Sequence, residues 1–200
     1  MDNILALRGD PMKNESAFVP TEGGNAYALN LIEQINEMNN GQYLYEETKN
    51  SPSNFCIGTA GYPEKHFEAM NLSTDMKHLK KKVDAGAEFI VTQLFYDNDK
   101  FFDFVKKCRE IGIKVPIIPG IKPITKLRHL SFIPKFFHVN FPESFSNELE
   151  KCKTDEEIKR VGIEWTTAQC KELVKADIPV IHFYTMGRGT AVKNIAKEIF

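Results

Sequence analysis

The chain has 200 residues, 42% of them hydrophobic and 11% aromatic, which is enough apolar material for one sizeable buried core and excludes a disordered chain. Its net charge of −1, from 26 basic and 27 acidic residues, creates no field that would attract nucleic acid or an anionic membrane. No apolar run approaches the roughly 20 residues that span a bilayer, so we expect one soluble domain over residues 1–200 with neither nucleic acid nor a membrane as partner.

Short apolar or β-branched runs recur along the chain and predict buried strands. In chain order they cover residues 4–7, 55–59, 89–95, 115–118 and 180–184. Residues 39–54 are polar and show neither the strand period nor the helix period, which indicates a long loop. Residues 122–140 contain Pro123 and Pro134, which break any long helix, so we expect a short helix and a turn there.

Apolar residues at helical spacing between these runs predict amphipathic helices. The helical sets are Met76, Leu79 and Val83, then Phe101, Val105, Cys108 and Ile111, then Ile158, Val161, Trp165 and Ala168. Thr154 and Glu157 have the spacing of a capping box at the start of the last helix, and the first two are expected to end at Gly86 and Gly112.

Strands that alternate with helices, and that are almost continuously apolar, indicate a parallel sheet covered by helices, which is the α/β class. The pattern alone leaves two architectures open, an open doubly wound sheet or part of a (β/α)₈ barrel. A complete barrel takes about 250 residues, so five strands in 200 residues would be too few to close one.

The cysteines and histidines give no sign of a metal site. Five histidines have no paired spacing, carboxylates do not cluster, and the four cysteines match neither a zinc pattern nor a disulfide framework. We expect buried or half-buried thiols at Cys56, Cys108, Cys152 and Cys170. No basic leader precedes the first apolar stretch, so a signal peptide is not expected and a cytoplasmic location follows.

In parallel α/β folds the active site forms where the strands end. The residues expected at those ends are Arg8, Gly9 and Asp10 after the first strand, residues 61–66 after the second, Gln93 in the third, Pro119 and Gly120 after the fourth, and residues 185–188 after the fifth. Gln93 is the most informative, because an amide buried in an apolar strand must find a partner. Asp10 as a turn carboxylate, His66 as a surface residue and the basic run 77–82 as a solvated helix face remain open alternatives.

Six motifs then occur in the order in which the methylenetetrahydrofolate reductase family has them. They are NILALRGD at residues 3–10, AGYP at 60–63 followed by His66 and by Glu68 and Ala69, KVDAGA at 82–87, TQLF at 92–95, IPGI at 118–121 and HFYT at 182–185. From residue 3 to the C-terminus the chain resembles that family, in a form nearer to its eukaryotic members. The resemblance implies a (β/α)₈ barrel with FAD, which reduces methylenetetrahydrofolate to methyltetrahydrofolate with NADPH or NADH as the reductant.

The resemblance also implies roles for particular residues. The positions that match flavin contacts of the family are Arg8, Gly9, Asp10, Tyr27, Ala28, Tyr62, His66, Ala69, Asp75, His78, Lys81 and Lys82. Lys81 and Lys82 would then face the diphosphate or the ribityl chain of FAD. Asp10 and Gln93 are the catalytic candidates, and Asp10, Gln93 and Arg188 are the candidates for folate binding, with Gln93 meeting folate and nicotinamide in turn.

The chain departs from the family at its start. The family's general acid, a glutamate on its first strand, has no counterpart here, and the pattern enters near the family's fourth strand. We therefore expect a partial FAD-binding reductase barrel that lacks the first three strand–helix units, without the eukaryotic regulatory domain. The alternative is a non-catalytic homologue that binds a partner or a full-length reductase subunit, and a homo-oligomer that completes the barrel also remains open.

Overall fold

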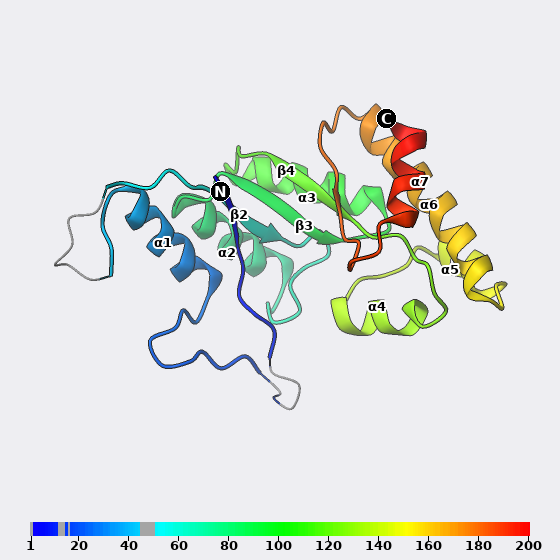
Figure 1. Cartoon of the computed structure of the whole chain (residues 1–200), viewed down its shortest axis with the longest axis horizontal. Helices are drawn as coiled ribbons and strands as arrows, with labels where there is room; N and C mark the ends of the chain where they lie inside the picture. The colour runs from blue at the N-terminus through cyan, green and yellow to red at the C-terminus, as the bar shows by residue number, and fades with distance from the viewer. Residues whose placement is uncertain (1, 12–14, 16, 45–50) are drawn as a thin grey trace.

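A computed structural model describes residues 2–11, 15, 17–44 and 51–200. The strands are β1 (Asn3–Ala6), β2 (Cys56–Gly61), β3 (Phe89–Leu94), β4 (Ile117–Ile121) and β5 (His182–Phe183). The helices are α1 (Ala28–Asn39), α2 (Leu72–Asp84), α3 (Asn98–Glu110), α4 (His129–Phe137), α5 (Glu143–Glu150), α6 (Asp155–Lys175) and α7 (Thr190–Ile199). Helices α1 and α2 lie at one end of the molecule and α4 to α7 at the other (Figure 1).

The five strands form one sheet in the order β1-β2-β3-β4-β5, and every neighbouring pair is parallel. A doubly wound sheet reverses its strand order at a switch point, whereas a barrel adds each strand beside the previous one. The sequential order therefore decides between the two predicted architectures in favour of the (β/α)₈ barrel family. In the described residues the sheet stops at five strands, with β1 and β5 as its edges.

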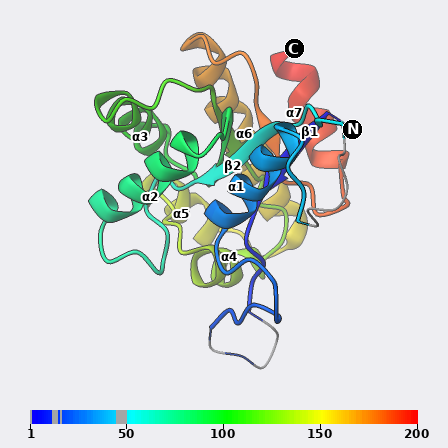
Figure 2. The same cartoon turned by 90° about the vertical axis from the view of Figure 1, so that its left-hand side faces the viewer.

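The helices cover one face of this sheet, as they do in a barrel. Ile57 and Ile90 lie on the same face, because Thr59 pairs with Ile90 and stands two residues after Ile57. Ile57 packs with Ile32 of α1, while Ile90 packs with residues of α2, α3, α6 and α7. Figure 2 views the molecule from the end where α1 and α2 lie.

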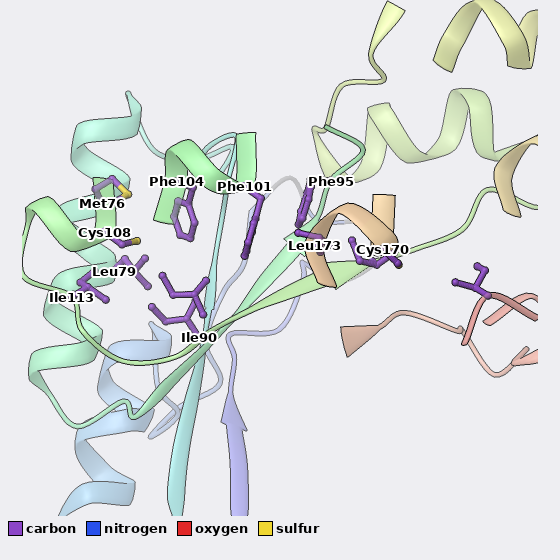
Figure 3. Packing of buried hydrophobic residues seen from close by; sticks show 13 residues of the cluster. Met76, Leu79, Ile90, Phe95, Phe101, Phe104, Cys108, Ile113, Cys170 and Leu173 are labelled. Carbon is purple, nitrogen blue, oxygen red and sulfur yellow. The ribbon is translucent and has the colours of Figure 1, made fainter. Parts of the chain in front are cut away.

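The largest buried cluster lies between the sheet and helices α2, α3, α6 and α7 (Figure 3). Met76 and Leu79 of α2 meet Phe104 and Cys108 of α3 over Ile90. This confirms the predicted apolar faces of both helices. Two predicted core positions are wrong: Ile111 is 39% exposed because it caps the end of α3, and Ala168 is exposed on α6.

The fourth strand lies further along the chain than predicted. It covers Ile117–Ile121 rather than residues 115–118, so Pro119 and Gly120 are inside the strand and not in the loop after it. The register shifts between Val91 and Leu94, and there the Gly120 N–H donates to Thr92 Oγ1 at 2.9 Å instead of following the regular ladder. A proline and a glycine fit this irregular stretch.

Most of the predicted helix ends and loops are confirmed. Gly86 and Gly112 follow α2 and α3 with φ of 122° and 81°, a backbone region that favours glycine. Residues 40–44 and 51–54 contain neither helix nor strand, as predicted for a loop, but Asn39 is the last residue of α1, so the loop begins one residue later than predicted. Residues 45–50 of that prediction lie outside the described residues. The short helix predicted within 122–140 is α4. Pro134 lies inside this nine-residue helix, three residues before its end, so it does not stop a short helix from forming.

Cys108, Cys152 and Cys170 are buried, Cys56 is half-buried, and all four are free thiols, as predicted. No helix among the described residues is long and apolar enough to cross a membrane. In the same residues, no three metal-binding side chains come together.

Removing the cap of α6 is expected to cost about 1 kcal/mol of unfolding free energy. Thr154 Oγ1 accepts from the Glu157 N–H at 3.2 Å, and Glu157 Oε2 accepts from the Thr154 N–H at 3.1 Å, which is the predicted capping box. Thr154→Ala leaves one of these amides without its partner. Urea unfolding of the variant would measure the loss, and Thr154→Ser, which keeps the hydroxyl, should retain most of the stability.

Candidate functional site

Arg8 joins the end of β1 to the loop that follows β2. Its Nη2 atom donates to Glu68 Oε1 at 2.7 Å, and its guanidinium carbon lies 5.2 Å from the centre of the Phe18 ring. The hydrogen bond to Glu68 raises the pKa of Arg8, and the same bond lowers the pKa of Glu68. Because Glu68 is partly exposed, the pair adds little stability, and its main effect is to hold the arginine in place.

Two aromatic rings stand beside this ion pair. Tyr62 follows β2 directly and meets His66 edge to face, with the ring centres 4.6 Å apart. Burial, helped by the charge of Asp75, raises the pKa of Tyr62 to about 12, and burial lowers the pKa of His66. At neutral pH both rings are therefore uncharged, so they offer flat, weakly polar surfaces next to the charged groups.

Helix α2 contributes two charges of opposite sign from one face. Asp75 and Lys82 are seven residues apart, or about two turns, so both reach back toward the end of β2. Asp75 Oδ2 accepts from the His66 N–H at 2.8 Å, and Lys82 Nζ donates to the Ala60 carbonyl oxygen at 2.7 Å. Burial lowers the pKa of Lys82 to about 8, against the opposing effect of Asp75. Lys82 is half-buried and has no carboxylate within hydrogen-bond distance among the described residues, so its cation is well suited to an anionic ligand.

Gln93 lies on β3 next to this group. Its Oε1 atom accepts from the Leu94 N–H at 2.9 Å, and its side chain is half-buried. It lines a small pocket together with Tyr62, Lys65 and His138. Among the described residues its amide nitrogen has no hydrogen-bond acceptor, so that group is available to a ligand.

Comparison with known proteins shows which family the chain belongs to. The family model described as methylenetetrahydrofolate reductase matches residues 1–199. The chain belongs to the methylenetetrahydrofolate reductase family. This confirms the resemblance drawn from the six motifs.

Similar relatives come from plants, animals and bacteria. Methylenetetrahydrofolate reductase (NADH) 1 of Arabidopsis thaliana is 42% identical, with 93% of this chain and 31% of that protein covered. A probable methylenetetrahydrofolate reductase (NADPH) of Caenorhabditis elegans is 36% identical over 98% of this chain and 28% of its own length. The 5,10-methylenetetrahydrofolate reductase of Pectobacterium carotovorum is 31% identical over 93% of this chain and 56% of its own length. The chain thus spans about a third of the length of its eukaryotic relatives.

The remaining positions assigned by the family resemblance are less closely gathered. Asp10 is exposed, yet near enough to Tyr62 for its charge to raise that pKa, and Tyr27, 64% exposed, acts in the same way on Arg8. Gly9 lies against Phe18, Ala28 begins α1, and Ala69 is buried. His78, Lys81 and Arg188 are exposed, and no hydrogen bond or ion pair joins their side chains to the cluster in the described part of the chain. Their roles remain predictions.

Two features of this reductase-family site were not predicted. Glu68 stood within a motif but was not assigned the role of fixing Arg8. Lys122 is 8% exposed directly after β4; its Nζ donates to the Tyr184 carbonyl oxygen at 3.4 Å, and burial lowers its pKa. A lysine immediately after an apolar strand could have been recognised from the sequence as a candidate site residue. It was not, because the fourth strand was predicted to end at residue 118 instead of Ile121.

A larger hollow of about 340 Å³ lies elsewhere, between the start of α3, the start of α5 and α6. Tyr96, Asp97, Trp165 and Glu172 are among its lining residues, and none of the predicted site residues is. It stands apart from the family's site at the ends of β1 and β2.

Proposed function

We propose that this chain carries part of the active site of a flavin-dependent reductase that converts 5,10-methylenetetrahydrofolate to 5-methyltetrahydrofolate with NADPH or NADH, in the one-carbon and methionine metabolism of the cytoplasm. The observation that supports it most directly is the half-buried Lys82 ammonium, which donates to the Ala60 carbonyl oxygen near the end of β2, within a cluster that includes Arg8, Tyr62 and His66. The family match covers every one of these residues.

The residues fit FAD chemically. Lys82 and Arg8 supply cations for a diphosphate. Arg8 already has Glu68 as its partner, whereas Lys82 has no carboxylate within hydrogen-bond distance in the part of the chain that the structure describes. Tyr62 and His66 supply uncharged rings on which a flat ring system can pack. When bound, the flavin would supply the hydride chemistry that amino-acid side chains lack, taking hydride from the nicotinamide and giving it to the methylene carbon of folate.

The side chains themselves bind, orient and set charge. The free amide nitrogen of Gln93 can donate to a polar edge of either substrate, so one residue can orient folate and nicotinamide in turn. Asp10 places a negative charge near Tyr62, and its proposed role is to contact the folate. Lys82 and Arg8 would hold the cofactor, and Arg188 would bind the acidic tail of folate.

Visible absorbance of the purified chain tests this proposal. After FAD is added and the excess removed, a retained flavin band that bleaches with anaerobic NADPH or NADH is the expected result, and turnover of methylenetetrahydrofolate would be measured next. Bleaching with one dinucleotide but not the other would also reveal the choice of reductant. A colourless chain would show that residues 1–200 do not form a flavoenzyme by themselves.

One feature favours a second function, that of a partner-binding homologue. The outer edges of β1 and β5 pair with no other strand in the described residues, and unpaired edges are templates for another chain. A colourless chain that forms a stoichiometric complex with a full-length reductase, or with itself, in size-exclusion chromatography would support this alternative.

A further inference from the structure

Lys65 has the most unusual backbone of any described residue near the site. Its φ is 110°, a backbone conformation that residues other than glycine rarely adopt. Three other described residues with a side chain have positive φ, and theirs lie between 49° and 59°, within the ordinary left-handed region. Strained backbone persists only where the surroundings fix it, and it occurs often at ligand sites.

The side chain of Lys65 shows what fixes it. Its ammonium donates to three backbone carbonyl oxygens of the next four residues: that of His66 at 3.0 Å, that of Phe67 at 3.4 Å and that of Ala69 at 2.6 Å. An ammonium has three hydrogens to donate, so these three carbonyls satisfy all of its donors. The loop 66–69 folds around the ammonium of Lys65. The strained φ is what turns the chain so that these carbonyls face the ammonium of the residue before them.

The clamped loop carries the central contacts of the candidate site. The His66 N–H donates to Asp75, the Glu68 N–H donates to His66 Nδ1 at 3.2 Å, and Glu68 accepts from Arg8. The loop therefore connects β1, the end of β2 and helix α2. A displacement of its backbone would move His66 and Arg8 together.

We propose that Lys65 is a positioning residue of the flavin site, whose ammonium clamps the loop 66–69 so that His66, Glu68 and Ala69 are held in place before a ligand arrives. This inference rests on the proposed function for the identity of the ligand. Lys65 would act through the loop, because its ammonium already donates to three backbone carbonyl oxygens. A preorganised loop binds its ligand more tightly because less ordering accompanies binding.

The clamp can be tested without any ligand, by amide hydrogen exchange of the 200-residue chain. In Lys65→Met, which keeps the length of the side chain but removes the donors, the His66 and Glu68 amides should exchange at least about tenfold faster, a change equal to roughly 1.4 kcal/mol. Amides in β2 and α2 should keep their rates. Uniformly faster exchange would mean only a general loss of stability and would overturn the proposal.

Three further variants sharpen the result. Lys65→Arg retains donors and should restore most of the protection, and Lys77→Met, which removes an exposed lysine of α2, is the control that should change nothing. Lys65→Gly relieves the backbone strain but lacks the clamp, so it should fold at least as well as Lys65→Met and still exchange fast at His66. Normal protection in Lys65→Gly or Lys65→Met would overturn the clamp.

Flavin binding gives the second readout. The dissociation constant for FAD should rise about tenfold in Lys65→Met and recover in Lys65→Arg. Faster exchange with an unchanged FAD affinity would overturn the positioning role. If the unaltered chain binds no FAD, the proposed function fails for this chain, and the exchange rates still decide separately whether Lys65 clamps the loop.

Discussion

Gly162→Ala is expected to destabilise the chain by about 3 kcal/mol or more, although alanine is the better helix former. Gly162 lies in the middle of α6 where that helix crosses the segment after β4. A Cβ atom added there would be 2.0 Å from the Ile124 carbonyl oxygen and 2.8 Å from its carbonyl carbon. Both are backbone atoms of a buried residue, so the clash cannot be relieved by rotating a side chain.

The measurement is denaturant unfolding of the variant beside a matched control. Gly189→Ala makes the same chemical change at a glycine with no atom within 4 Å of the added Cβ, and it should cost about 1 kcal/mol or less. Equal stabilities of the two variants would show that α6 does not press against the segment after β4 as closely as the structure has it. A stabilised Gly162→Ala would mean that helix propensity alone governs this position.

The architecture could be predicted from local pattern only up to a point. The apolar runs located all five strands, and the glycines after α2 and α3 located two helix ends, because burial and backbone conformation act on neighbouring residues. The end of β4 could not be located, since it depends on Thr92 of the adjacent strand accepting from Gly120. Helix α1 had not been assigned from the sequence, although it buries Ile32 and Ile35 three residues apart. The choice between a barrel and a doubly wound sheet depends on strand order, which no single segment encodes.

The candidate site, too, could be predicted from the sequence only in part. Arg8, Tyr62, His66, Asp75 and Lys82 were all named from the sequence by family resemblance, and the structure brings them into one cluster. Neither Glu68 nor Lys65 was assigned, because their roles depend on how a short loop folds back on itself. From the sequence, Lys81 and Lys82 were both predicted to face the diphosphate or the ribityl chain of FAD. In the helix they point about 100° apart, which leaves Lys81 exposed and turns Lys82 inward.

Lys82→Met is expected to weaken FAD binding by about tenfold to a hundredfold, the range for losing one hydrogen bond between charged groups. The substitution keeps most of the side-chain volume and removes the half-buried cation that we assign to the diphosphate. Fluorescence titration of FAD would give the dissociation constants. Lys77→Met removes a lysine from the exposed side of the same helix, so it controls for the loss of one positive charge.

The pH dependence separates this cation from a merely structural lysine. The pKa of Lys82 is about 8 in the folded chain, against 10.5 as the ordinary value. Between these two values the unfolded chain binds more protons, so the contribution of Lys82 makes the folded chain more stable as pH rises from about 8 toward 10.5. An anionic ligand favours the protonated amine instead. Hence FAD affinity should fall as pH rises through about 8, and binding in that range should take up a proton.

Both effects should disappear together in Lys82→Met, because methionine has no proton to exchange. Calorimetry of FAD binding in two buffers of different ionisation enthalpy would count the protons, and unfolding at several pH values would give the stability profile. A variant that keeps the FAD affinity of the unaltered chain would remove Lys82 from the cofactor site. A variant that loses the affinity while the unaltered chain shows no proton uptake near pH 8 would mean that Lys82 is already charged without a ligand, and that its burial at the end of β2 is shallower than the structure shows.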